Sequence, residues 1–337
     1  YEWVGEVPFE EMPHALNPDQ GYLVSCNHKI VGEDYPHFLG NAWMNGYRAR
    51  RLSELIESRE KVSFQDHQAF QMDVKCLPGL ELVARLGGVT DPDVEVQLAL
   101  GLLREWDGYL TTESVGGTVY EVVRYTLVRN LLEPGLGDDL ATRLMGKGFH
   151  PLLNHANEFY GHDTVVLLRL LDEPESWWLK QAGGHDVLIS KSLSQAVRWL
   201  RDQLGADETQ WKWGRIHQAS FDHPLALRKP FDQVFSRGPY PLGGDTDTPL
   251  QTAVHPEKPY NNKVWSPTFR QIVDMKDLSR SIAVISPGQS GQLSSPHYDD
   301  LIKPWLEGEY HPMLWTREQV ESEAVVKLSL KGTGESG

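Results

Sequence analysis

The stretch NPDQGYLVSCNHKIVGEDYPHFLGNAWMNGYRARR, residues 17–51, decides how the rest of the chain can fold. It opens with a turn signal, because Pro18 presets φ and Gly21 tolerates the positive φ of a tight turn. The apolar run Tyr22–Cys26 is short and rich in residues typical of strands, which predicts a buried strand. This predicted strand ends at Asn27, where rigid backbone would hold a side-chain amide.

An amide at the end of a buried strand can aim its NH2 group at a developing negative charge. Preorganised donors of this kind stabilise an oxyanion by about 3–4 kcal/mol. The competing interpretation is that Asn27 satisfies only its own turn, as Asn often does after a strand. The local pattern alone leaves both interpretations open.

The middle of the chain has the periodicity of helices. From Arg48 onward, Leu52, Leu55 and Ile56 recur at i, i+3 and i+4, as an apolar helix face requires. Ser63 and Asp66 form a variant of the capping box that opens a second helix. Further helices are predicted over residues 78–86, 92–106, 115–132 and 192–204.

The last third returns to loop and strand signals. Residues 211–262 are rich in Pro, Gly and aromatic residues, which predicts irregular structure. Ser281–Ile285 and Ala324–Leu330 predict strands. The order of elements indicates the α+β class, with strands near both ends in one sheet and a large helical insertion between them. We expect one body with three parts: a strand and active-site segment (1–47), a mainly helical part (48–210), and loops with returning strands (211–337).

The composition narrows the classes of function. The 337-residue chain is 40% hydrophobic, with eleven Trp and twelve Tyr, which supports a substantial core. Its formal net charge of −15 argues against a nucleic-acid surface and against binding anionic membranes. No apolar run approaches the roughly 18–20 residues of a membrane-spanning helix, and the first residues lack the basic and apolar regions of a signal peptide. Cys26 and Cys76 define neither a disulfide framework nor a metal site.

Two groups of polar residues are better explained as structural. His217 and His223 lie among aromatic residues without the spacing of metal ligands, so we expect hydrogen-bonded structural roles. Asp245 and Asp247 are spaced like the start of an EF-hand but lack its distal Glu, so a turn with Asx hydrogen bonds is the better prediction. These residues therefore predict no metal site.

Four ordered blocks of sequence span nearly the whole chain. They are G-Y-L-V-S-C-N-H with D-Y-P and Y-R-A-R-R-L-S-E-L (21–55), W-K-W-G-R-I-H to H-P-L (211–225), G-G-D-T-D-T (243–248), and G-Q-S-G with S-P-H-Y-D-D and a Trp (288–305). Together the blocks resemble the penicillin amidase family of N-terminal-nucleophile hydrolases. The fold that this resemblance implies is the C-terminal portion of an αββα N-terminal-nucleophile hydrolase.

The resemblance implies hydrolysis of linear amides such as penicillins, cephalosporin side chains and acyl-homoserine lactones. Family members are precursors that cut themselves into α and β chains, and the new N-terminal Ser of the β chain attacks the amide with its own α-amine as base. A backbone N–H and an Asn hold the oxyanion, and that Asn matches Asn27. The family's catalytic Arg, at the start of the R-L-S-E-L helix, matches Arg51. Without the resemblance, Arg51 is read as a solvated helix cation.

One departure from the family pattern is decisive. Residue 1 is Tyr, which offers neither an aliphatic hydroxyl nor a thiol beside the α-amine. We therefore expect a C-terminal part of a β chain, inactive by itself, whose partners are the α chain, the N-terminal part of the β chain and a small-molecule amide. No cofactor is expected in this chain. Family members often bind calcium, to which only Asn41 could offer an oxygen at the matching place. The resemblance places such an enzyme in the periplasm or outside the cell.

Two other functions stay open. A non-catalytic binding or interaction module would use the many Trp and Tyr side chains as apolar anchors. A self-contained hydrolase with paired carboxylates is the third hypothesis, although no acid pair stands out among the 47 acidic residues. Amidase activity of the purified chain alone would favour this third hypothesis.

Overall fold

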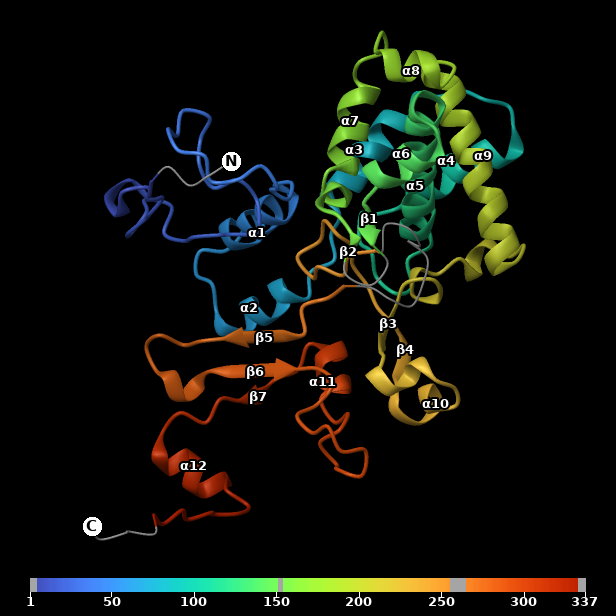
Figure 1. The fold of residues 1–337 in the computed structure, drawn as a ribbon. Coiled ribbons are helices and arrows are strands. Elements are labelled where there is room, and N and C mark those ends of the chain that lie inside the picture. Colours follow the sequence, from blue (N-terminus) through green and yellow to red (C-terminus); the bar gives the residue numbers. More distant parts are fainter. Residues whose placement is uncertain (1–4, 151–153, 255–264, 333–337) are drawn as a thin grey trace. The chain divides into compact units, whose positions relative to one another are not determined.

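A computed structural model describes residues 5–150, 154–254 and 265–332 (Figure 1). The chain divides into two compact units. The first comprises Tyr1–Val62 and Phe70–Pro267, and the second comprises Ser63–Ala69 and Thr268–Gly337.

Helices dominate the first unit. They are α1 (Tyr47–Glu57), α3 (Leu77–Leu86), α4 (Val94–Glu105), α5 (Val115–Leu136), α6 (Asp138–Leu144), α7 (Asp163–Leu171), α8 (Trp177–Gln181), α9 (His185–Leu204) and α10 (Phe231–Phe235). Two antiparallel pairs of short strands accompany them: β1 (Lys147–His150) with β2 (Asn154–Ala156), and β3 (Gln218–Phe221) with β4 (Arg237–Pro241).

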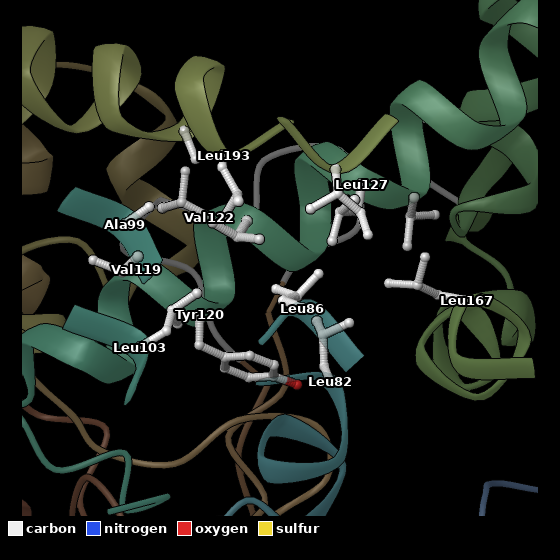
Figure 2. Close-up of a cluster of buried hydrophobic side chains, with 14 of the residues drawn as sticks. Leu82, Leu86, Ala99, Leu103, Val119, Tyr120, Val122, Leu127, Leu167 and Leu193 are labelled. Atoms are coloured by element: carbon white, nitrogen blue, oxygen red, sulfur yellow. The ribbon is translucent and has the colours of Figure 1, made fainter. Parts of the chain in front are cut away.

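The core of this unit is built around α5. This helix is buried on all its sides over residues 117–124 and on one face from Leu127 to Leu132, which is the pattern of a central helix. Figure 2 shows Val119, Val122 and Leu127 of α5 among leucines from its neighbours. Those neighbours are Leu82 and Leu86 of α3, Leu103 of α4, Leu167 of α7 and Leu193 of α9.

Local sequence signals explain where the core helices begin and end. The Asp93 side chain accepts hydrogen bonds from Glu95 N and Val96 N at the start of α4, and the Ser114 side chain accepts one from Gly117 N at the start of α5. Pro78 lies in the first turn of α3, as predicted. Two predicted bounds were wrong. The helix predicted to end at residue 132 continues through Pro134 to Leu136. The helix predicted to begin at residue 192 begins at His185, because the first turns of α9 already bury Leu188 and Ile189.

The second unit contains a small sheet and three helices. Strands β5 (Phe269–Ile272), β6 (Ile282–Ile285) and β7 (His311–Pro312) form an antiparallel sheet in the order β5-β6-β7. The helix α2 (Phe64–Gln71) begins in this unit, and the predicted capping box is confirmed because Ser63 N donates to Asp66 Oδ2 (2.8 Å) and Asp66 N to Ser63 Oγ (3.1 Å). The other helices are α11 (Ile302–Glu307) and α12 (Arg317–Glu323).

The α+β class is confirmed, and the strand at 282–285 is present, but two other predicted strands were wrong. Tyr22–Cys26 forms no strand ladder, Leu23 is 67% exposed, and only the single parallel bridge between His28 and Met44 follows it. Ala324–Leu330 is likewise unpaired and exposed. A strand needs a neighbour for its backbone hydrogen bonds, and no residue in the described ranges supplies one to either segment. The first and last predicted strands therefore do not share a sheet.

Candidate active site

The Asn27 side chain is exposed, and both its backbone and its amide are held in place. Its φ is +61°, a conformation that Asn tolerates better than most residues. Its backbone oxygen accepts a hydrogen bond from Met44 N (2.9 Å). Its Oδ1 accepts one from Arg48 Nη2 (2.9 Å), which also donates to Cys26 O (2.8 Å). A guanidinium can only donate, so the amide must turn its oxygen to Arg48 and its NH2 group the other way.

The NH2 group of Asn27 is available as a donor. No acceptor within the described ranges takes a hydrogen bond from Asn27 Nδ2, and the side chain reaches solvent. The oxygen of the same amide is occupied by Arg48. An oriented amide with a free donor is what an oxyanion-binding Asn needs. Asn27 lies in a turn, however, and not at the end of a strand as predicted.

Arg51 lies one turn beyond Arg48 on α1 and has a different partner. Its Nε and Nη2 donate to the two oxygens of Asp73 at 2.9 and 2.7 Å, and its side chain is 12% exposed. The hydrogen bonds that Arg51 donates to Asp73 are the main reason that the pKa of Arg51 is raised. The structure thus brings Arg48, and not Arg51, to the Asn27 amide. A catalytic role for Arg51 stays a prediction.

Asn45 links the Asn27 loop to α1 and to the interior of the unit. Its Oδ1 accepts from Tyr47 N (3.1 Å), the first residue of α1. Its Nδ2 donates to Asp247 Oδ1 (2.6 Å) and to Gly161 O (3.2 Å). One amide therefore joins three segments that lie far apart in the sequence.

Asp247 belongs to a group of acids that we call the carboxyl cluster, in which Glu121, Asp245 and Asp247 are buried and Asp163 is half-buried. Arg124 pairs with two of its members, at 3.0 Å from Glu121 Oε2 and 2.9 Å from Asp163 Oδ2. Asp245 shares a hydrogen bond with Glu121 and lies 3.3 Å from Cys76 Sγ. One guanidinium cannot neutralise three buried carboxylates and a fourth that is half-buried, so protonated forms are favoured within the cluster.

Burial sets the protonation of the carboxyl cluster. It raises the pKa of Asp245 well above its usual value, and the neighbouring Glu121 raises it further. Burial also raises the pKa of Asp247 to about 6, although the hydrogen bond from Asn45 acts in the opposite direction. Asp163 has a raised pKa for the same reason, with Arg124 opposing. At neutral pH, Asp247 is therefore mostly ionised, whereas burial and Glu121 both favour the protonated form of Asp245.

The predicted Asx turn is confirmed, because Asp247 N donates to Asp245 Oδ1 (2.8 Å). Sequence reasoning missed that this turn is buried against α5. The available signal was Glu121 and Arg124, two charged residues inside an apolar helix at a spacing of i, i+3.

The histidine and tryptophan predictions can also be compared with the structure. His217 is fully buried, with its ring nitrogens 2.8 Å from Leu242 O and 3.0 Å from Thr252 O, so its structural role is confirmed. His223 accepts from Leu225 N at the start of a short 3-10 helix. Trp211 and Trp213 are fully buried. These two side chains are therefore not available to a partner, whereas Trp177 and Trp315 are more than half exposed, so the binding module stays an open alternative.

The possible contribution of Asn41 to a calcium site stays a prediction. Asn41 lies on an exposed loop, and nowhere in the described ranges do three or more His, Cys, Asp or Glu side chains gather as metal ligands. We also find no helix among these ranges that is long and apolar enough to cross a membrane.

Comparisons with known proteins agree on one family. The model of the family described as penicillin amidase matches residues 1–322. The acyl-homoserine lactone acylase QuiP of Pseudomonas aeruginosa is 27% identical over 341 residues, covering 92% of this chain and 39% of that protein. The penicillin acylase 2 proenzyme of Pseudomonas sp. (strain SE83) is 27% identical over 340 residues, covering 98% and 41%. The chain thus spans about two fifths of the length of these relatives.

A solved structure supports the fold. The thermostable penicillin G acylase from Alcaligenes faecalis, in its orthorhombic form, superposes with a TM-score of 0.60 at 19% sequence identity. The match covers 99% of this chain and 61% of that one.

Proposed function

Because this chain belongs to the penicillin amidase family, we propose that it supplies the oxyanion-stabilising part of an acylase that hydrolyses linear amides. The substrates would be of the penicillin, cephalosporin or N-acyl-homoserine lactone type. The observation that carries this proposal is the exposed Asn27 amide, whose oxygen is held by Arg48 while its NH2 group has no acceptor among the described residues.

In this proposal the Asn27 NH2 group donates a hydrogen bond to the carbonyl oxygen of the scissile amide as that oxygen becomes negative. The donor is already oriented, so little reorganisation accompanies the attack. Arg48 keeps Oδ1, which would repel the oxyanion, turned away from it. The positive φ of Asn27 and the hydrogen bond from Met44 hold the backbone from which the side chain projects.

The nucleophile belongs to a segment outside this chain. By the family pattern, it is a Ser whose own α-amine removes the hydroxyl proton. Its partners would be the α chain and the N-terminal part of the β chain, and this chain by itself would be inactive. The complete enzyme would act in the periplasm or outside the cell, and calcium, if bound, would take its ligands from those other segments.

Arg51 has a separate place in the proposal. Its bidentate pair with Asp73 fixes the guanidinium, and a fixed cation near the reacting centre would stabilise the same developing charge. Arg51 would act alongside the Asn27 amide, without touching it.

The proposal is tested with the complete enzyme by the substitution Asn27→Ala. We expect kcat to fall about 10²- to 10³-fold, because one oxyanion donor is lost. The control is Asn17→Ala, which removes another exposed Asn with a positive φ (+47°) and should leave kcat unchanged. Equal rates for the two variants would refute the assignment of Asn27.

The missing nucleophile is tested by mass spectrometry of the mature protein. We expect a β chain that begins with Ser upstream of Tyr1, and no amide hydrolysis by the 337-residue chain alone. Activity of that chain alone would instead favour the self-contained hydrolase.

A further inference from the structure

We propose that Asn45 and Asp247 are positioning residues that hold the Asn27 amide and the Arg48 guanidinium in their working arrangement. This inference rests on the proposed function. Neither residue touches the reacting atoms, so each acts through Asn27 and Arg48.

The first step is the place of Asn45 between the two contacts that fix Asn27. Met44 directly precedes Asn45, and its N–H donates to Asn27 O at 2.9 Å. Tyr47 directly precedes Arg48, and its N–H donates to Asn45 Oδ1 at 3.1 Å. A change in the Asn45 side chain would therefore disturb both the backbone contact and the side-chain contact of Asn27.

The second step is the anchor at the other end of the Asn45 amide. Asp247 is 4% exposed and accepts from Asn45 Nδ2 at 2.6 Å. Its own backbone is fixed, because Asp247 N donates to Asp245 Oδ1 and Asp245 N to Thr248 Oγ1 (2.8 and 2.9 Å). Asn45 is thus hydrogen-bonded to a rigid turn inside the unit, and this contact restrains the exposed segment that contains Asn27.

A tight fit beside Asn45 supports the same picture. Gly161 O accepts from Asn45 Nδ2 at 3.2 Å. A Cβ added at Gly161 would lie 2.5 Å from Met44 Sδ. The segment around Gly161 therefore packs directly against the residue that holds the Asn27 backbone.

The strength of the anchor depends on the charge of Asp247. An ionised carboxylate accepts a stronger hydrogen bond than a protonated one does. Since burial raises the pKa of Asp247 to about 6, the anchor weakens as the pH falls through that value. The charged and titratable groups that face Asp247 are Arg124, which favours its ionisation, together with Glu121, Asp163, Asp245, Cys76 and Tyr47.

The test uses three variants of the complete enzyme: Asn45→Ala, Asp247→Ala and Asp247→Asn. The first two remove the anchor, and we expect kcat to fall about 10- to 100-fold with KM changed less than about twofold, because the donor is displaced while the substrate still binds. Asp247→Asn keeps an oxygen that can accept from Asn45 but no longer titrates. Because this amide is uncharged, as the protonated carboxyl is, the kcat of Asp247→Asn should match that of the wild type well below about pH 6 and should no longer rise as the pH passes through that value.

The matched control is Asn130→Ala. Asn130 Nδ2 also donates two hydrogen bonds, to Ser192 Oγ (2.9 Å) and Gln195 Oε1 (2.8 Å), but these join α5 to α9. It should leave kcat and the pH profile unchanged. If Asn45→Ala and Asp247→Ala retain kcat as well as Asn130→Ala does, the inference is wrong.

A second measurement does not depend on activity. The Met44 amide proton is protected by Asn27 O, so Asn45→Ala should accelerate its hydrogen exchange about tenfold or more relative to the wild type and to Asn130→Ala. If the wild-type enzyme hydrolyses no amide, the proposed function fails while this exchange rate still decides the role of Asn45. Unchanged exchange at Met44 would overturn the positioning role even in an active acylase.

Discussion

The carboxyl cluster leads to a quantitative prediction about stability and pH, through the substitution Asp247→Asn. The pKa of Asp247 is raised from 3.8 to about 6 in the folded chain, chiefly by burial. A difference of about two units corresponds to about 3 kcal/mol between the two protonation states. Since the group is fully buried, solvent does not screen this effect.

The sign of the effect follows from proton binding. The folded state holds the Asp247 proton more tightly than the unfolded state does, so the contribution to stability is complete below about pH 4. It is lost as the pH rises through about 6. Asn at this position carries no titrating proton. The difference in free energy of unfolding, Asp247→Asn minus wild type, should therefore increase by about 3 kcal/mol as the pH rises from about 4 to about 7.5.

The measurement is urea unfolding of both proteins at a series of pH values, followed by circular dichroism and fluorescence to check that the transition is two-state. Asp172→Asn is a control of opposite sign. Asp172 is exposed and hydrogen-bonded to Arg85, which lowers its pKa, so its contribution is present at neutral pH and disappears as the pH falls. If the difference in free energy of unfolding between the wild type and Asp247→Asn stays constant with pH, the reasoning is refuted.

Three further predictions test the core, a helix cap and the second arginine. Leu127→Ala should lower the free energy of unfolding by about 2–5 kcal/mol, because Leu127 is fully buried on α5; denaturant unfolding measures this loss. Ser114→Ala should lower it by about 1 kcal/mol, since Gly117 N loses its acceptor, whereas Ser114→Thr should restore most of the difference in the same assay. Arg51→Gln should lower kcat of the complete enzyme about 100-fold, whereas the substitution Arg50→Gln at an exposed position should change kcat little. Equal rates for the two variants would mean that Arg51 has only a structural role, through its ion pair with Asp73.

Much of the fold could be predicted because the relevant signals are local. The capping box at Ser63, Pro78 in the first turn of α3 and the Asx turn at Asp245 each depend on residues within one turn of the chain. The missing strand at 22–26 shows the limit of such signals. An apolar run specifies that a segment can pair, but a partner must be present for the strand to form.

The candidate site could be predicted only in part. The assignment of Asn27 follows from its place after an apolar run and from the family resemblance, and its catalytic role stays a prediction. The contact that orients its amide comes from Arg48, and which of the three arginines at 48, 50 and 51 reaches it depends on where α1 begins. The link from Asn45 to Asp247 spans 202 residues of sequence. No local pattern encodes a contact at that separation, so the role of the G-G-D-T-D-T turn emerged from tertiary packing alone.

The unpaired tail after α12 has a practical consequence for handling the protein. Val325, Val326, Leu328 and Leu330 are 81–97% exposed. Such a run of β-prone side chains with open backbone groups can add to the edge of a sheet in another molecule, and Lys327 is its single charge. Concentrated solutions should therefore turn cloudy or form oligomers, and replacing Val326 and Leu328 with Lys should extend the shelf life of purified material.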